Sequence, residues 1–248
     1  MSGHSKWATI KRQKGTTDAK RGQLFTKLSN AIYIAAKSGG IDPDSNPRLR
    51  LIIDTAKASN MPKENIERAI KKSHSKNDNE LVEVQYEGFG PGGFSVIIEA
   101  ITDNKQRTSP EIKSRMEKLG GNLGIPGSVA YQFEQKGLIT VARGEMSMDD
   151  LFLIAASAEA DDIEEVGEDV FIYTKRENLA KVKDGLTSNS LIVKNVEIIR
   201  VPLTPISLVD KSTAMKALQF VEKLEELDDV QKVYVNFDIP DEIGKTLI

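Results

Sequence analysis

Apolar residues recur every three to four positions along the first 76 residues, a spacing that predicts amphipathic helices. The three apolar stripes are Leu24, Leu28, Ala31, Ile32 and Ala35; Leu49, Ile52, Ile53 and Ala56; and Ile66, Ala69 and Ile70. The sequence Ser-Gly-Gly at 38–40 is expected to end the first helix, Asn46 before Pro47 to cap the second, and Pro62 to open the third. The polar, turn-forming stretch 73–80 then predicts a domain boundary.

Beyond this stretch the pattern changes to alternating strands and helices. Apolar runs predict strands over 81–86, 94–101 and 129–133. Ser109-Pro110 is expected to begin a helix, and Gly120 to end it. These elements alone are one helix and one strand short of a complete α+β domain.

Residues 138–201 read as a β-α-β-β-α-β series, which is typical of a ferredoxin-like sandwich. Because a long amphipathic helix and a strand follow this series, we expect one α+β domain to be split in sequence around an insertion. The predicted domains are a basic helical domain at 1–78, a split α+β domain at 79–134 and 205–248, and an inserted domain at 135–204. The fold class is therefore α+β multidomain: a helical bundle and two ferredoxin-like α/β domains, one inserted in the other.

Charge changes the picture most. Of the 34 Lys and Arg residues, 16 lie in residues 1–76, together with only 6 of the 37 acids. The first part thus carries a net +10 and the remainder −13, although the whole chain has a net charge of only −3. Such asymmetry predicts a polyanionic partner for the basic part.

Composition excludes several classes of chemistry. The 248 residues contain no cysteine and two histidines, so disulfides, thiolate metal sites and multi-histidine sites are excluded. Neither His4 nor His74 has a triad-like neighbourhood, and we expect no enzyme activity, cofactor, metal or small-molecule substrate. No apolar run is long enough to span a bilayer and no secretory signal is visible, so we expect a cytoplasmic protein without a membrane partner.

One glycine-rich motif resembles a nucleotide-binding loop. Residues 88–93 (Gly-Phe-Gly-Pro-Gly-Gly) match G-x-G-x-x-G formally. A dinucleotide site needs a helix directly afterwards, whereas a strand is expected here and Pro91 lacks an amide donor. A hairpin turn is the favoured interpretation.

Candidate nucleic-acid contacts lie in the basic part, because phosphates are bound by Lys and Arg. They are Lys6, Trp7, Lys11, Arg12, Lys14, Lys20, Arg21, Lys27, Arg48, Arg50, Lys63, Arg68, Lys71 and Lys72. Trp7 is equally suited to stacking on a base or packing on the helices. The two helices at 47–59 and 62–72 form either a helix-turn-helix that reads the major groove or, more commonly, a structural hairpin.

Several segments resemble the YebC family. They are GHSKW at 3–7, DAKRG-x-x-FTKL at 18–28, GG-x-DP-x-x-NPRLR at 39–50, NMPKENIERAIKK at 60–72, YEGFGPGG at 86–93, TDN-x-x-RT at 102–108, GGNLG-x-x-GSVAYQFE at 120–134 and YVNFDIP at 234–240. The resemblance implies a helical bundle and two α+β domains, one inserted in the other, without enzymatic activity or cofactor. It also implies DNA-binding transcriptional regulation or, as in the related mitochondrial translational activator of cytochrome c oxidase, a role in translation.

Two functions follow from these expectations. The first is a non-enzymatic, DNA-binding transcriptional regulator that acts through its basic N-terminal domain. The alternative is a ribosome-associated translation factor that binds ribosomal or transfer RNA and relieves stalling, for example at proline-rich stretches. The sequence leaves open whether DNA or RNA is the target.

Overall fold

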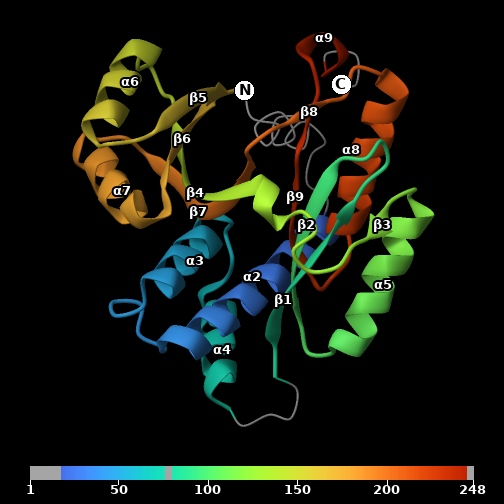
Figure 1. Cartoon of the computed structure of the whole chain (residues 1–248). Helices are drawn as coiled ribbons and strands as arrows, with labels where there is room; N and C mark the ends of the chain where they lie inside the picture. Colours follow the sequence, from blue (N-terminus) through green and yellow to red (C-terminus); the bar gives the residue numbers. More distant parts are fainter. Residues whose placement is uncertain (1–17, 76–79, 245–248) are drawn as a thin grey trace. The chain divides into compact units, whose positions relative to one another are not determined.

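The computed structural model describes residues 18–75 and 80–244 (Figure 1). Within these ranges the protein is a mixed α/β protein with eight α-helices and two four-stranded sheets. It divides into two compact units: residues 134–201 form the smaller one, and the described residues on either side of them form the larger one.

Three helices form the N-terminal part of the larger unit. They are α2 (Asp18–Gly39), α3 (Pro47–Ala58) and α4 (Lys63–His74). Apolar side chains of all three share one core, in which Ile32 and Leu49 are fully buried. The helices therefore have the amphipathic pattern predicted for them, except that Leu24, placed on the buried stripe, is 42% exposed.

Asn46 fixes the corner between α2 and α3. Its Oδ1 accepts the backbone N–H of Leu49 at 3.1 Å, which is the predicted N-cap. Its Nδ2 donates to the carbonyls of Ala35 at 2.8 Å and Gly40 at 2.7 Å, at the end of α2. Gly40 has φ +90°, a conformation that glycine adopts without strain. One buried amide thus joins the end of one helix to the start of the next.

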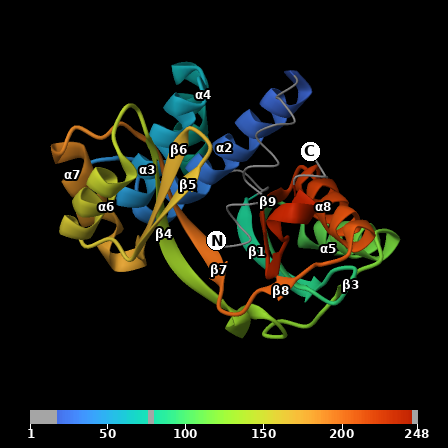
Figure 2. The same ribbon diagram turned by 90° about the horizontal axis from the view of Figure 1, so that it is seen from above.

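The second part of the larger unit is a sheet covered by two helices. Its strands, in the order β3-β1-β2-β9, are β1 (Val82–Phe89), β2 (Ser95–Thr102), β3 (Asn122–Leu123) and β9 (Val230–Val235). The helices α5 (Lys105–Lys118) and α8 (Lys211–Glu225) share one apolar core with β2 and β9 (Figures 1 and 2). A short parallel pair, β8 (Ile206–Ser207) with β10 (Phe237–Asp238), and the turn α9 (Asp241–Gly244) follow.

The glycine-rich motif is a hairpin turn, as predicted. Strands β1 and β2 pair antiparallel up to Phe89 and Ser95, and Gly90 N–H donates to the carbonyl of Phe94 at 2.8 Å. The Phe94 ring lies against Gly90 so closely that a Cβ there would come within 2.1 Å of the ring. The motif's glycines therefore serve a tight turn and a buried ring, and no helix follows them.

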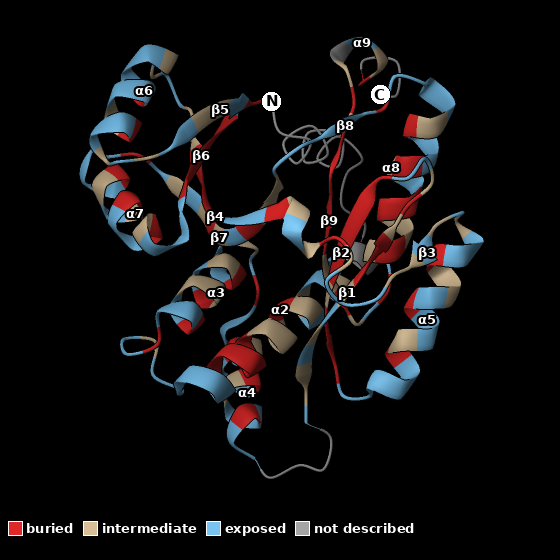
Figure 3. Ribbon diagram, viewed as in Figure 1, coloured by how far each residue is buried: buried red, intermediate tan, exposed pale blue. Residues whose placement is uncertain are grey.

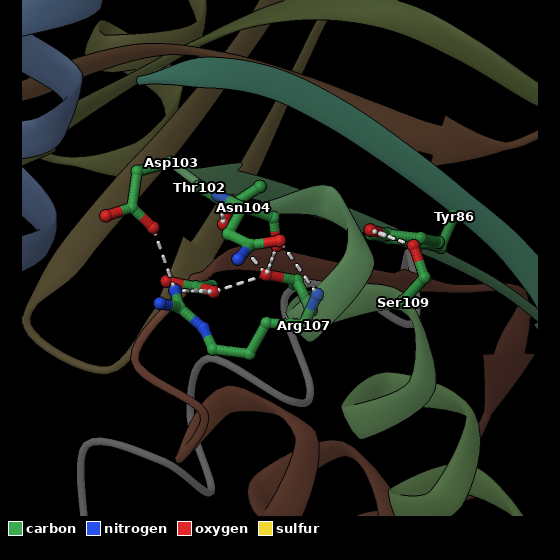
Figure 4. A network of polar contacts seen from close by, with 8 residues as sticks. Tyr86, Thr102, Asp103, Asn104, Arg107 and Ser109 are labelled. Atoms are coloured by element: carbon green, nitrogen blue, oxygen red, sulfur yellow. Dashed lines mark hydrogen bonds and ion pairs between the residues drawn. The ribbon is translucent and has the colours of Figure 1, made fainter. Parts of the chain in front are cut away.

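A polar network holds the start of α5 (Figure 4). Asp229, in the turn before β9, accepts hydrogen bonds from Thr108 Oγ1 at 2.5 Å and from the Arg107 guanidinium at 2.9 Å. Burial raises the pKa of Asp229, but the hydrogen bonds from Thr108 and Arg107 outweigh it and lower the pKa. Asn104 caps the helix, because its Oδ1 accepts a hydrogen bond from the backbone N–H of Arg107 at 3.1 Å.

This network corrects one prediction. The helix was expected to begin at Ser109-Pro110, but α5 begins at Lys105 and contains Pro110. Capping by Asn104 and the anchoring of Thr108 start the helix earlier. Pro110 lies on an exposed position near the N-terminal end, where its ring removes one intrahelical hydrogen bond.

A second correction concerns residues 129–133, which were expected to form a strand. Ala130–Gln132 is a 3₁₀ turn, and β4 starts at Phe133. The reason is Glu87, a buried carboxylate on β1. It accepts the N–H groups of Gly127, Val129 and Ala130 at 2.8–2.9 Å, so these donors bond to a side chain and not to a strand.

Glu87 is therefore expected to matter for stability. Glu87→Gln should lower the free energy of unfolding by about 1–3 kcal/mol, because the amide turns one acceptor into a donor facing N–H groups. Burial raises the pKa of Glu87, but the backbone hydrogen bonds outweigh this and leave the pKa below its ordinary 4.5. The stabilisation by the Glu87 carboxylate is then fully present above pH 4.5 and is lost as the pH falls through the lowered pKa.

Urea denaturation at several pH values measures this effect. The gap between wild type and Glu87→Gln should be widest near neutral pH and narrow in acid. Glu83→Gln is the matched control, because Glu83 is exposed on the same strand and its surface ion pair with Arg48 is worth about 1 kcal/mol or less. Equal effects of the two substitutions would contradict the role assigned to Glu87.

The smaller unit follows the predicted element order. It consists of β4 (Phe133–Ala142), α6 (Met148–Ser157), β5 (Asp162–Val166), β6 (Asp169–Lys175), α7 (Leu179–Ser188) and β7 (Val193–Pro202). The strands lie in the order β5-β6-β4-β7, with β6 antiparallel to both β5 and β4. Ser147 caps α6, because its Oγ accepts a hydrogen bond from the backbone N–H of Asp150 at 3.1 Å.

Candidate nucleic-acid interface

The predicted contact residues fall into four groups in the structure. The first group lies outside the described residues: Lys6, Trp7, Lys11, Arg12 and Lys14. Lys20 lies in α2, but its side chain is also outside the described set. The remaining residues are on α2, α3 and α4, and their surroundings differ.

A second group of cations is bound to groups of the protein itself. Arg48 forms an ion pair with Glu83 of β1. Arg50 donates to the carbonyls of Pro43 at 2.9 Å and Asp44 at 2.6 Å, and so holds the loop before α3. Lys27 Nζ donates to the carbonyl of Glu225 at 2.6 Å, at the end of α8. These contacts give Arg48, Arg50 and Lys27 a structural explanation within the larger unit.

A third group lies on the outer face of α4. Arg68, Lys71 and Lys72 are exposed and spaced at i, i+3 and i+4, which places them side by side on the helix. Ile66 and Ala69 are buried on the opposite face. Within the described ranges 18–75 and 80–244 the three cations form no ion pair, so their charge faces solvent.

The remaining two cations are exposed but have a neighbour. The Arg21 guanidinium lies 5.4 Å from the centre of the Phe25 ring. Lys63 lies 3.7 Å from Glu67, one turn further along α4. Both side chains reach solvent, so both remain compatible with contact to a phosphate.

Helix electrostatics supply a second reason for basic residues on these helices. Lys37, Lys57, Lys71 and Lys72 all lie in the last turn of α2, α3 or α4, where the carbonyl end of the helix favours cations. Two of them, Lys37 and Lys57, were not among the predicted contacts. Lys37 pairs with Glu80 at 2.5 Å, and this hydrogen bond raises the pKa of Lys37. Lys57 is exposed.

The pair α3 and α4 has the connectivity of a helix-turn-helix. In such motifs the N-terminal residues of the second helix face the bases. The exposed side of the first turns of α4 carries Glu64 and Glu67 beside Lys63, and carboxylates there repel a phosphate backbone. Among the described side chains of α4, the cations without an ion pair lie from the middle of the helix, at Arg68, to its last turn, at Lys71 and Lys72. This distribution suits phosphate contact better than insertion of the N-terminal end of α4 into a groove.

No described helix is long and apolar enough to cross a membrane. Among the described side chains, no cluster of three or more His, Asp or Glu is arranged to hold a metal ion.

These features describe a mixed α/β protein whose helical N-terminal part carries the basic charge. Residues 5–76 match the TACO1/YebC protein N-terminal domain, and residues 81–237 match the TACO1/YebC second and third domain. The chain belongs to the TACO1/YebC family, as its sequence motifs indicated.

Relatives from several bacteria match along the whole chain. A probable transcriptional regulatory protein of Chloroflexus aurantiacus is 49% identical and covers 98% of each chain. One of Geobacillus kaustophilus is 47% identical over 96% of this chain and 98% of the relative. The crystal structure of a conserved hypothetical protein from Aquifex aeolicus, 44% identical, superimposes with a TM-score of 0.85 over 91% of this chain and 93% of the other. Both bacterial relatives carry the name probable transcriptional regulatory protein.

Proposed function

We propose that this protein is a non-enzymatic regulator of gene expression that binds nucleic acid through its basic N-terminal part, residues 1–78, and that its target is DNA. The observation that carries the proposal is the segregation of charge: a net +10 in residues 1–76 within a chain of net charge −3. The relatives' name, probable transcriptional regulatory protein, supports regulation through DNA.

The mode of binding proposed is contact with the phosphate backbone. Arg68, Lys71 and Lys72 on α4 and the lysines and arginines of residues 6–21 supply the cations. Arg48, Arg50 and Lys27 instead stabilise the protein, because each is bound to another part of the larger unit. Phosphate contacts position a protein on nucleic acid but carry little sequence information.

A second candidate is a factor that binds ribosomal or transfer RNA. It is favoured by the carboxylates of Glu64 and Glu67 on the exposed side of the first turns of α4, where a helix that reads DNA bases needs neutral or basic groups. Structured RNA is recognised largely through its shape and its phosphates, for which a diffuse field of cations is sufficient.

Crosslinking in cells distinguishes the two targets. Bound DNA and bound RNA are sequenced from the same cells that express the full chain. Enrichment at promoters with no signal on structured RNA supports the transcriptional function. Enrichment on ribosomal or transfer RNA without promoter signal would contradict the DNA target and support the translation factor. Absence of both signals would contradict both candidate functions.

The α4 cations give a quantitative test. The triple substitution Arg68→Ala, Lys71→Ala and Lys72→Ala is expected to lower the salt dependence of binding by about 2.7 in log K against log salt on duplex DNA, or about 2.1 on single strands. Fluorescence anisotropy with labelled duplex DNA and with single-stranded RNA, across a salt series, measures both slopes.

The control for this experiment removes the same charge elsewhere. Lys105, Lys113 and Lys118 are exposed on α5, and their replacement by alanine should leave the slope unchanged. Thermal unfolding of both triple variants checks that neither loses its fold. Equal slopes for wild type and the α4 variant would show that these cations serve only the helix end.

For the architecture, we propose the three domains expected from the sequence: 1–78, the split domain 79–134 with 205–248, and the inserted domain 135–204. The strand order β5-β6-β4-β7 in a β-α-β-β-α-β series supports a ferredoxin-like fold for the inserted domain. The split domain reaches a related arrangement through the sheet β3-β1-β2-β9 and the helices α5 and α8.

A further inference from the structure

Helix α6 in the smaller unit is apolar on two sides. Leu151 and Ala155 are buried against the rest of the unit. On the other side Phe152 is 57% exposed and Leu153 63% exposed, and Ala156 is exposed beside them. Figure 3 shows α6 with buried positions on one side and exposed ones on the other.

The exposed side has the spacing of a helix-packing face. Asp149, Phe152, Leu153 and Ala156 follow at i, i+3, i+4 and i+7, so they form one continuous stripe along the helix. A surface helix of a soluble protein normally carries polar residues there. A contiguous exposed apolar patch with a polar rim is typical of protein interaction sites.

The surroundings of the stripe are acidic. Asp149 and Asp150 lie in the first turn of α6, and Glu159 follows the helix. Lys181 of α7 is already paired with Glu159 at 2.5 Å. Residues 134–201 as a whole contain 14 acids against 8 Lys and Arg residues. An apolar stripe with an acidic border therefore lies on a unit of net negative charge.

This charge decides which partner fits. A second copy docked through the same face would bring the same acidic border and no cation to pair with Asp149 and Asp150. Nucleic acid and anionic lipid are repelled by the same acids. A protein helix with apolar residues on one face and Lys or Arg beside them matches both the stripe and its border.

We propose that the outer face of α6 is the docking site for a basic amphipathic helix of a partner protein. Apolar side chains of that helix pack on Phe152, Leu153 and Ala156. Its cations pair with Asp149 and Asp150 at the first turn of α6. The proposal is independent of whether the basic N-terminal part binds DNA or RNA, because it involves only residues of the smaller unit.

A designed peptide pair tests the proposal on the full chain. One fluorescein-labelled peptide of about 18 residues carries leucine on one helical face and lysine on the other, and its partner carries glutamate in place of each lysine. Fluorescence anisotropy is expected to show saturable binding of the lysine peptide only. Substitution of both Phe152→Ser and Leu153→Gln should weaken it by about tenfold or more.

Two further variants separate the contributions. Asp149→Asn with Asp150→Asn should weaken binding severalfold and flatten its salt dependence, because the ionic part is removed. Ile192→Ser is the matched control, since Ile192 is 69% exposed in the same unit but lies outside α6. Its affinity for the peptide should equal that of the wild type, and circular dichroism of each variant checks the fold.

Several outcomes overturn the proposal. Equal binding of the lysine and glutamate peptides would remove the electrostatic argument. Unchanged binding by the Phe152 and Leu153 double variant would place the site elsewhere on the chain. A concentration-dependent dimer in sedimentation velocity that this variant abolishes would assign the stripe to a second copy.

Discussion

Alanine substitution of Lys11, Arg12, Lys20 and Arg21 is expected to weaken binding to duplex DNA on the order of 10³-fold at 0.15 M salt. Each phosphate that a cation neutralises releases condensed counterions, which contributes a slope of about 0.9 in log K against log salt. Four lost contacts should therefore reduce the slope by about 3.6, and the other cations proposed to contact phosphates keep the remaining binding salt-dependent. The loss should be similar for different DNA sequences, because phosphates are the same in all of them.

Fluorescence anisotropy with two unrelated duplexes of equal length, over a salt series, measures slope and affinity together. A matched variant removes four exposed cations from α5 and α8 by alanine substitution of Lys105, Lys113, Lys118 and Lys216. It changes the net charge of the chain equally and should bind as the wild type does. If both variants lose affinity alike, the effect belongs to net charge and the basic N-terminal part has no special role.

Phe94→Ala is expected to lower the free energy of unfolding of the larger unit by about 3–5 kcal/mol. Phe94 is fully buried. The centre of its ring lies 5.6 Å from that of Phe220 and 4.8 Å from that of Phe237, and both contacts are edge to face. The ring also fills the space beside Gly90, so its removal leaves a cavity where β2, α8 and β10 meet. Neither a backbone shift at the tight turn nor the two remaining rings can close that cavity fully.

Guanidinium denaturation followed by circular dichroism gives the change in midpoint. Tyr131→Ala removes an aromatic ring that is 71% exposed in the same unit, and it should change the free energy of unfolding by no more than about 0.5 kcal/mol. If Phe94→Ala lowers the free energy of unfolding no more than Tyr131→Ala does, the three rings are not the centre of this core.

Where local signals act alone, the sequence predicted the fold well. The cap at Asn46 before Pro47, the end of α2 at Ser-Gly-Gly 38–40 and the hairpin at 90–93 each depend on residues within four positions of one another. The errors come from distant partners. Pro110 lies inside α5 because Asp229 holds Thr108, more than 100 residues away, and 129–133 is not a strand because Glu87 binds its amides.

The candidate site shows the same division. Net charge located the basic part, but it could not show that Arg48 meets Glu83 or that Lys27 reaches Glu225. Those pairings depend on how α2 and α3 lie against the sheet and α8, which helical spacing alone does not determine. Arg68, Lys71 and Lys72 differ from them only in having solvent in front of them, and that difference is a property of the tertiary structure.

The backbone N–H of Leu203 donates to the carbonyl of Gln132 at 2.8 Å, so the chain leaves the larger unit and returns to it at the same place. A short turn would bridge the two points, and the remaining residues would keep their connectivity. Residues 134–201 are thus an insertion whose loss, exchange or lengthening during evolution would not change the path of the rest of the chain. Their sequence is then free to diverge toward new partners while the larger unit keeps its core.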